Sequence, residues 1–120
     1  MDGLLEVCID SKMNPDGSMT VGSLCIPGLS DEEYLVSTYC CHPSMANDNL
    51  SGLLVTALLA REMLAGGKPN KSWRFIFVPE TIGAIAYLFY NEVAMKKISG
   101  GLVATTCGGP GSFGYKETYL

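Results

Sequence analysis

The sequence predicts an α/β domain in which a mixed, mostly parallel sheet is flanked by helices. Across residues 34–106, three apolar strand patterns alternate with two helix patterns. This β-α-β-α-β order favours parallel strands joined by right-handed crossovers. The chain has 120 residues, of which 48% are hydrophobic and 17% are charged. This is the composition of one globular domain or of part of one.

The chain is predicted to open with a β-hairpin. Residues 4–9 and 19–26 are apolar strand patterns, and the Asn-Pro-Asp-Gly sequence at 14–17 is typical of a type I turn. Residues 30–33 are expected to be a polar connector. Residues 34–40 then form a nearly continuous apolar and β-branched run, which is typical of a strand buried on both faces.

A helix is predicted next, capped by Asn49 or Ser51 and ending near Ala65, before two glycines. A second buried strand at 73–78, a second helix at 81–97 and a third strand at 102–106 complete the pattern. The apolar sides predicted for the two helices are made by Leu50, Leu53, Leu54, Ala57 and Leu58 in the first, and by Ile82, Ile85, Ala86, Leu88 and Phe89 in the second.

Charge and cysteine content exclude several classes of function. The net charge is -4 and the basic residues form no cluster, which argues against nucleic acid or an anionic membrane as a partner. The longest apolar run, at 50–60, is too short to span a bilayer. The five cysteines include no CxxC pair and follow no secretory signal, so we expect a reducing, cytoplasmic compartment. Cys8, Cys25 and Cys40 lie in strand patterns and are predicted to be buried thiols.

His42 and Asp48 are the candidate metal ligands. They lie between the first buried strand and the first helix, and His42 is the only histidine. Neutral imidazole and carboxylate are the groups that zinc prefers at neutral pH. Asn47 and Asn49 could orient Asp48. The alternative is a lone surface histidine beside an N-cap aspartate, but the full string and its place at a strand-to-helix junction favour the metal site.

Glu80 is the candidate general base or acid. It follows the second buried strand, and the carboxyl ends of parallel strands share one edge of a sheet, where ligand sites form. We expect partial burial there, which suits a group that transfers protons. The alternative is a solvated glutamate at a helix N-terminus.

Other candidates are weaker or open. A Cys41–His42 nucleophilic pair is disfavoured, because neighbours on an extended segment point to opposite faces. The glycine-rich loop at 108–111 lacks the Lys-Ser/Thr ending of a P-loop, so a plain turn is expected. Tyr39 and Tyr115 are either substrate-facing or ordinary half-buried aromatics.

These residues resemble a known family. The Ala-Asn-Asp-Asn-Leu-Ser-Gly string at 46–52 resembles the A-N-D-N-x-S-G box of co-catalytic zinc aminopeptidases of the bacterial leucyl aminopeptidase type. There the aspartate bridges two metals, a role that would fall to Asp48. Residues 77–83 resemble the family's E-E-x-G segment, whose first glutamate is the general base and corresponds to Glu80. A closer match is a branch of aminopeptidase-like proteins associated with polysaccharide biosynthesis.

The chain departs from the family pattern in two respects. Thr81 stands where the aminopeptidases have a second, metal-binding glutamate. A full family domain is much longer and supplies a further aspartate and a distant histidine as ligands, whereas His42 is the only histidine here. The resemblance therefore implies a three-layer, zinc aminopeptidase-like fold of which residues 1–120 form the central portion.

We expect a zinc-dependent hydrolase that cleaves an amide bond in a small peptide-like or aminoacylated substrate. The alternative is a non-catalytic remnant with a binding or assembly role. Because only His42 and Asp48 are clear ligands, the chain alone is expected to bind zinc weakly and to turn over no simple amino-acid amide. An uncovered sheet edge at the third strand predicts self-association into a homo-oligomer.

Overall fold

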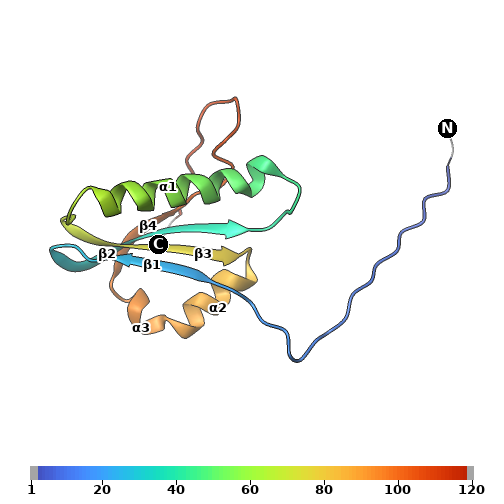
Figure 1. Ribbon diagram of the computed structural model, residues 1–120, viewed down its shortest axis with the longest axis horizontal. Helices are drawn as coiled ribbons and strands as arrows, with labels where there is room; N and C mark the ends of the chain where they lie inside the picture. Colours follow the sequence, from blue (N-terminus) through green and yellow to red (C-terminus); the bar gives the residue numbers. More distant parts are fainter. Residues whose placement is uncertain (1–2, 119–120) are drawn as a thin grey trace.

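The computed structural model describes residues 3–118 and shows a four-stranded mixed sheet with helices on both faces (Figure 1). The strand order is β1-β3-β2-β4. β2 (Ser30–Cys40) is parallel to β3 (Lys71–Pro79) and to β4 (Ile98–Val103), while β1 (Gly22–Ile26) is antiparallel to β3. The predicted mixed, mostly parallel sheet is therefore confirmed.

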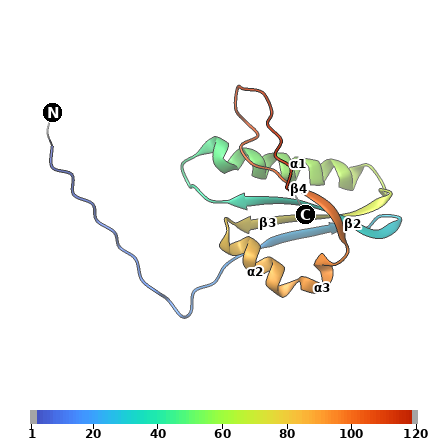
Figure 2. The same cartoon turned by 180° about the vertical axis from the view of Figure 1, so that it is seen from behind.

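The predicted N-terminal hairpin is wrong. Residues 3–21 form no strand and extend away from the sheet (Figures 1 and 2). The turn itself is present, since the amide of Gly17 donates to the carbonyl of Asn14 at 3.1 Å. β1 instead pairs with β3, so the backbone groups of residues 4–9 have no ladder partner. An apolar pattern alone does not make a strand without a neighbouring edge to accept it.

Two hydrophobic clusters hold the helices against the sheet. β3 places alternate side chains on opposite faces, as strands do. On one face Phe75 and Val36 pack with Ala60 of α1 (Gly52–Ala65). On the other face Ile76 and Val78 pack with Tyr87 of α2 (Ile82–Tyr90). Figure 2 shows α1 on one side of the sheet and α2 with α3 (Glu92–Met95) on the other.

The side of each helix that the sequence predicted to face the sheet is the wrong one. α1 buries the small residues Gly52, Thr56 and Ala60, which lie four positions apart and bring the helix close to the sheet. The leucines at 50, 54 and 58 are about half exposed. In α2 the buried residues are Gly83 and Tyr87, and the apolar side predicted to face the sheet is largely exposed.

Three predicted boundaries also move. β2 begins at Ser30, so residues 30–33 belong to the strand and are not a connector. The helix predicted at 81–97 is divided into α2 and α3 at Asn91, whose side chain donates to the carbonyl of Tyr87 at 2.9 Å and competes with the backbone ladder. The last strand runs from Ile98 to Val103, earlier than predicted.

The five cysteines, all within the described residues, have free thiols. Cys8, Cys25 and Cys40 are exposed, so their predicted burial is wrong. No helix within residues 3–118 has both the length and the apolar character needed to cross a membrane.

Candidate functional site

The site forms where β2 and β3 end together. Cys40 is the register partner of Pro79, and the amide of Glu80 donates to the carbonyl of Cys40 at 3.0 Å. This backbone bond fixes the last residues of the two parallel strands side by side. The residues that follow each strand, Cys41 and Glu80, therefore leave the sheet at the same point.

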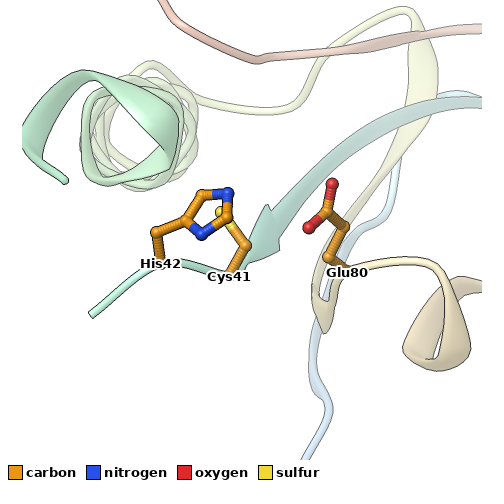
Figure 3. Close-up of side chains that lie close together, drawn as sticks. All are labelled: Cys41, His42 and Glu80. Atoms are coloured by element: carbon orange, nitrogen blue, oxygen red, sulfur yellow. The ribbon is translucent and has the colours of Figure 1, made fainter. Parts of the chain in front are cut away.

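Cys41, His42 and Glu80 meet at this edge (Figure 3). One potential ligand atom from each of the three side chains lies within 4.8 Å of the other two. The argument that Cys41 and His42 must point apart was wrong, because β2 ends at Cys40 and the strand geometry ends with it. Cys41 is half-buried, whereas His42 and Glu80 are exposed, so the predicted partial burial of Glu80 is also wrong.

A tight turn places Glu80 ahead of α2. The amide of Ile82 donates to the carbonyl of Glu80 at 2.6 Å, and Thr81 between them has a φ of 58°. That left-handed conformation is unfavourable for a β-branched residue and costs on the order of 1–3 kcal/mol. The rest of the fold must compensate for this unfavourable conformation. The turn keeps Glu80 outside the helix, beside the end of β2.

Asp48 closes the other side of the site. Its Oδ2 lies 3.9 Å from Nε2 of His42, and its Oδ1 lies 3.8 Å from Sγ of Cys41. The hydroxyl of Tyr39 donates to the same Oδ1 at 3.1 Å. The Asp48 side chain is 31% exposed and the His42 side chain is 51% exposed, so the site is open to solvent on the His42 side.

The asparagines on either side of Asp48 anchor the loop. Asn49 is 2% exposed, and its amide nitrogen donates to Thr38 and to the carbonyls of Tyr39 and Ala104 at 3.0–3.3 Å. Its side-chain oxygen accepts from the amide of Thr106 at 3.0 Å. The peptide bond between Asp48 and Asn49 is cis. Asn49 thus ties the loop before α1 to the ends of β2 and β4.

Asn47 makes a second, more exposed anchor. Its side-chain oxygen accepts from the amide of Gly108 at 2.9 Å and from the hydroxyl of Ser51 at 3.1 Å. The sequence analysis assigned capping of α1 to Asn49 or Ser51, but neither side chain caps it. Within residues 3–118, the hydroxyl of Tyr39 donates a hydrogen bond to the side chain of Asp48, whereas the side chains of Asn47 and Asn49 bond elsewhere. The sequence does not decide whether Tyr39 and Tyr115 face a substrate. Tyr39 bonds to Asp48, whereas Tyr115 is 86% exposed.

The carboxylates make the site electrostatically negative. Desolvation raises the pKa of the Cys41 thiol, a hydrogen bond from the backbone at His42 lowers it, and the charges of Asp48 and Glu80 raise it further, with a net increase. The hydrogen bond with Thr105 lowers the pKa of the Tyr39 hydroxyl. Desolvation, the bond to Asp48 and the charges of Asp48 and Glu80 outweigh that effect, so the pKa is raised overall. The charges of Asp48 and Glu80, which contribute to both increases, would attract a cation.

The donor set suits zinc. Zinc–sulfur bonds of 2.3 Å and zinc–nitrogen or –oxygen bonds of 2.0–2.1 Å in a tetrahedron place neighbouring donor atoms about 3.3–3.6 Å apart. The His42–Asp48 and Cys41–Asp48 separations of 3.9 and 3.8 Å need only small side-chain movements to reach that spacing. Imidazole, carboxylate and thiol are all established zinc ligands. Cys41 is not among the candidate ligands predicted from the sequence, although it directly follows a buried strand pattern.

The fold and the site define a mixed α/β domain in which side chains of types that can bind a metal lie together at the carboxyl edge of its parallel strands. The profile of DUF4910, a domain of unknown function, matches residues 10–119, and the chain belongs to this family. It is 50% identical over 113 residues to a protein of Clostridium acetobutylicum named "Putative polysaccharide biosynthesis protein with aminopeptidase-like domain". That match covers 94% of this chain and 26% of the relative, so the chain spans about a quarter of the relative's length.

A solved structure supports the relationship. The chain is similar to the crystal structure of a protein described as a "putative peptidase" from Clostridium acetobutylicum, determined at 2.37 Å resolution. The TM-score is 0.72 at 48% sequence identity, and the match covers 76% of this chain and 21% of the other. The mixed α/β fold is therefore shared with part of that protein.

Proposed function

We propose that this chain carries the metal-binding part of a zinc-dependent, aminopeptidase-like hydrolase. Its substrate would be a small peptide-like or aminoacylated molecule, cleaved at an amide bond. The observation that carries the proposal is the position of His42 at the carboxyl edge of β2 and β3, where one of its ring nitrogens lies within 4.8 Å of a carboxylate oxygen of Glu80 and its Nε2 lies 3.9 Å from Oδ2 of Asp48. The names of the two relatives, an aminopeptidase-like protein and a peptidase, support the same reaction class.

Each residue would have a distinct role. His42 and Asp48 would hold one zinc ion, and Tyr39 would keep Asp48 oriented through its 3.1 Å hydrogen bond. Zinc, when bound, supplies a Lewis acid that polarises the substrate carbonyl. Glu80 is exposed and adjacent, so its carboxylate can take a proton from the attacking water and return it to the leaving amine. The proton gained in the first step is thus lost in the second.

The fold proposal follows from the same residues. We propose that the sheet and its two helical faces belong to the three-layer, zinc aminopeptidase type, with residues 1–120 corresponding to the central portion of such a domain. Thr81 lies in the turn after Glu80 and offers no carboxylate, which favours one metal over two.

Metal content and catalysis test the proposal separately. At equilibrium with added zinc in the dialysis buffer, the purified chain should hold about one zinc ion. His42→Ala or Asp48→Ala should lower zinc affinity about tenfold or more, because loss of a direct ligand should weaken binding at least as much as loss of a residue that only orients a ligand. If the chain, or a longer protein that contains it, hydrolyses an aminoacyl substrate, Glu80→Gln should keep the zinc but lower kcat by about 100-fold or more, as loss of a general base does. Zinc affinity that is unchanged in both ligand variants would overturn the metal site.

The same measurements separate the alternative. A non-catalytic remnant with a binding or assembly role would hold no zinc under the same dialysis conditions. Loss of zinc from Glu80→Gln would instead make Glu80 a ligand and leave the reaction without its proposed base.

A further inference from the structure

We propose that the Cys41 thiolate is the third protein ligand of the zinc ion held by His42 and Asp48. This inference rests on the proposed function and deepens it, because it adds a donor of a different chemical type to the two proposed ligands. Catalytic zinc sites use three protein ligands and keep one position open. Cys41, which the sequence suggests only as a nucleophile, lies close enough to His42 and Asp48 to be such a donor.

The distances support Cys41 in this role. Its Sγ lies 3.8 Å from Oδ1 of Asp48, and it also belongs to the cluster whose potential ligand atoms lie within 4.8 Å of one another. Asp48 thus lies close to both Cys41 and His42. A zinc tetrahedron needs neighbouring donors about 3.3–3.6 Å apart, so small side-chain rotations complete it.

Burial separates Cys41 from Glu80 as the third ligand. Cys41, which directly follows β2, is half-buried, whereas Glu80 is exposed. A half-buried donor suits a permanent ligand, and an exposed carboxylate beside it is free to exchange protons. When the zinc–sulfur bond forms, the thiol proton leaves to solvent and the sulfur gains the metal.

A thiolate ligand also sets the metal preference. Sulfur is a soft donor that favours zinc and cobalt over magnesium and calcium, which prefer oxygen. The imidazole of His42 already favours zinc over magnesium and calcium, and a thiolate would strengthen that preference.

Cobalt(II) is a suitable probe, because thiolate ligation gives a thiolate-to-cobalt charge-transfer absorption that imidazole and carboxylate do not. Titration of the 120-residue chain with cobalt under reducing conditions should produce this absorption at about one equivalent. Cys41→Ser should abolish it and weaken cobalt affinity about tenfold or more. Cys40→Ser is the matched control, because Cys40 is the exposed neighbour and should leave the absorption and the affinity unchanged.

A second variant guards against misfolding and stray thiols. In a variant with Cys8, Cys25, Cys40 and Cys107 all changed to Ser, Cys41 is the only thiol, and the charge-transfer absorption should persist. Cobalt bound without that absorption, yet lost in His42→Ala, would overturn the role of Cys41 while the proposed function stands. Failure of the chain to bind either cobalt or zinc would overturn both.

Discussion

The hydroxyl of Tyr39 donates a 3.1 Å hydrogen bond to Oδ1 of Asp48, and it lies 2.6 Å from the hydroxyl of Thr105. Tyr39 belongs to β2, while Asp48 lies in the loop before α1 and Thr105 follows β4. One phenol therefore joins three segments at the edge where the candidate metal ligands lie. Since a carboxylate with a fixed orientation binds a metal better than a free one, this contact should contribute to metal affinity.

Tyr39→Phe should weaken zinc binding without removing it. The variant keeps the ring and loses only the hydroxyl, so Asp48 remains present but less constrained. We expect a decrease in zinc affinity of about tenfold, the low end of the range for residues that orient ligands. Calorimetric titration would measure it, with Tyr115→Phe as the control because that ring is 86% exposed. Equal zinc affinities for Tyr39→Phe and the unchanged chain would show that Tyr39 does not orient Asp48.

Asn49→Ala should destabilise the fold. Asn49 is 2% exposed and bonds to Thr38, Tyr39, Ala104 and Thr106. Its removal leaves several buried polar groups without this partner, and we expect the free energy of unfolding to fall by about 3 kcal/mol. Urea unfolding would measure this. Asn47→Ala is the matched control, because its bonds are exposed and its loss should cost about 0.5 kcal/mol. Similar losses in the two variants would contradict the anchoring role of Asn49.

The sequence predicted the parallel part of the sheet because its signals are local. Apolar runs bounded by glycine and proline identified β2, α1 and β3 to within a few residues, and parallel order follows from the alternation of strand and helix. The N-terminal hairpin failed because pairing is a long-range choice: β1 joins β3, about 50 residues away, and not residues 4–9. The inward faces of α1 and α2 failed because close packing selects Gly52 and Gly83 over larger apolar residues.

The site was predictable in its location but not in its contacts. The rule that parallel strands end at one edge predicts that His42 and Glu80 lie close together, and potential ligand atoms of the two side chains lie within 4.8 Å of each other. The contribution of Cys41 depends on the direction of its side chain after β2 ends at Cys40, which no periodicity specifies. The Tyr39–Asp48 bond likewise depends on the path of an irregular loop.

Removal of one partner of the ion pair between Glu33 and Arg74 should strongly lower the free energy of unfolding. Nε and Nη2 of Arg74 donate to the two carboxylate oxygens of Glu33 at 2.7 and 3.1 Å, and the Glu33 side chain is only 7% exposed. These hydrogen bonds raise the pKa of Arg74, so the pair stays charged. Arg74→Met leaves a buried carboxylate without its partner and should lower the free energy of unfolding by about 3 kcal/mol.

The control for that change is the exposed pair formed by Arg61 and Glu62. Their side chains are 70% and 68% exposed, and Arg61→Met should change the free energy of unfolding by less than about 0.5 kcal/mol. Thermal or urea unfolding of both variants gives the comparison. A loss in Arg74→Met no larger than that in Arg61→Met would show that water reaches Glu33 and solvates its charge.

The open edge of β4 should cause self-association. Within residues 3–118 the strand ladder of β4 has β2 as its only partner, so its outer backbone groups are available to another strand. Leu102 and Val103 at its end are 50% and 60% exposed. We expect light scattering to give a mass above 12.8 kDa. Val103→Lys should lower that mass, because a charge on an edge strand opposes pairing, whereas Leu58→Lys on α1 should not. A chain that is monomeric before any change, or a mass that falls only with Leu58→Lys, would place the β4 edge outside any interface between copies.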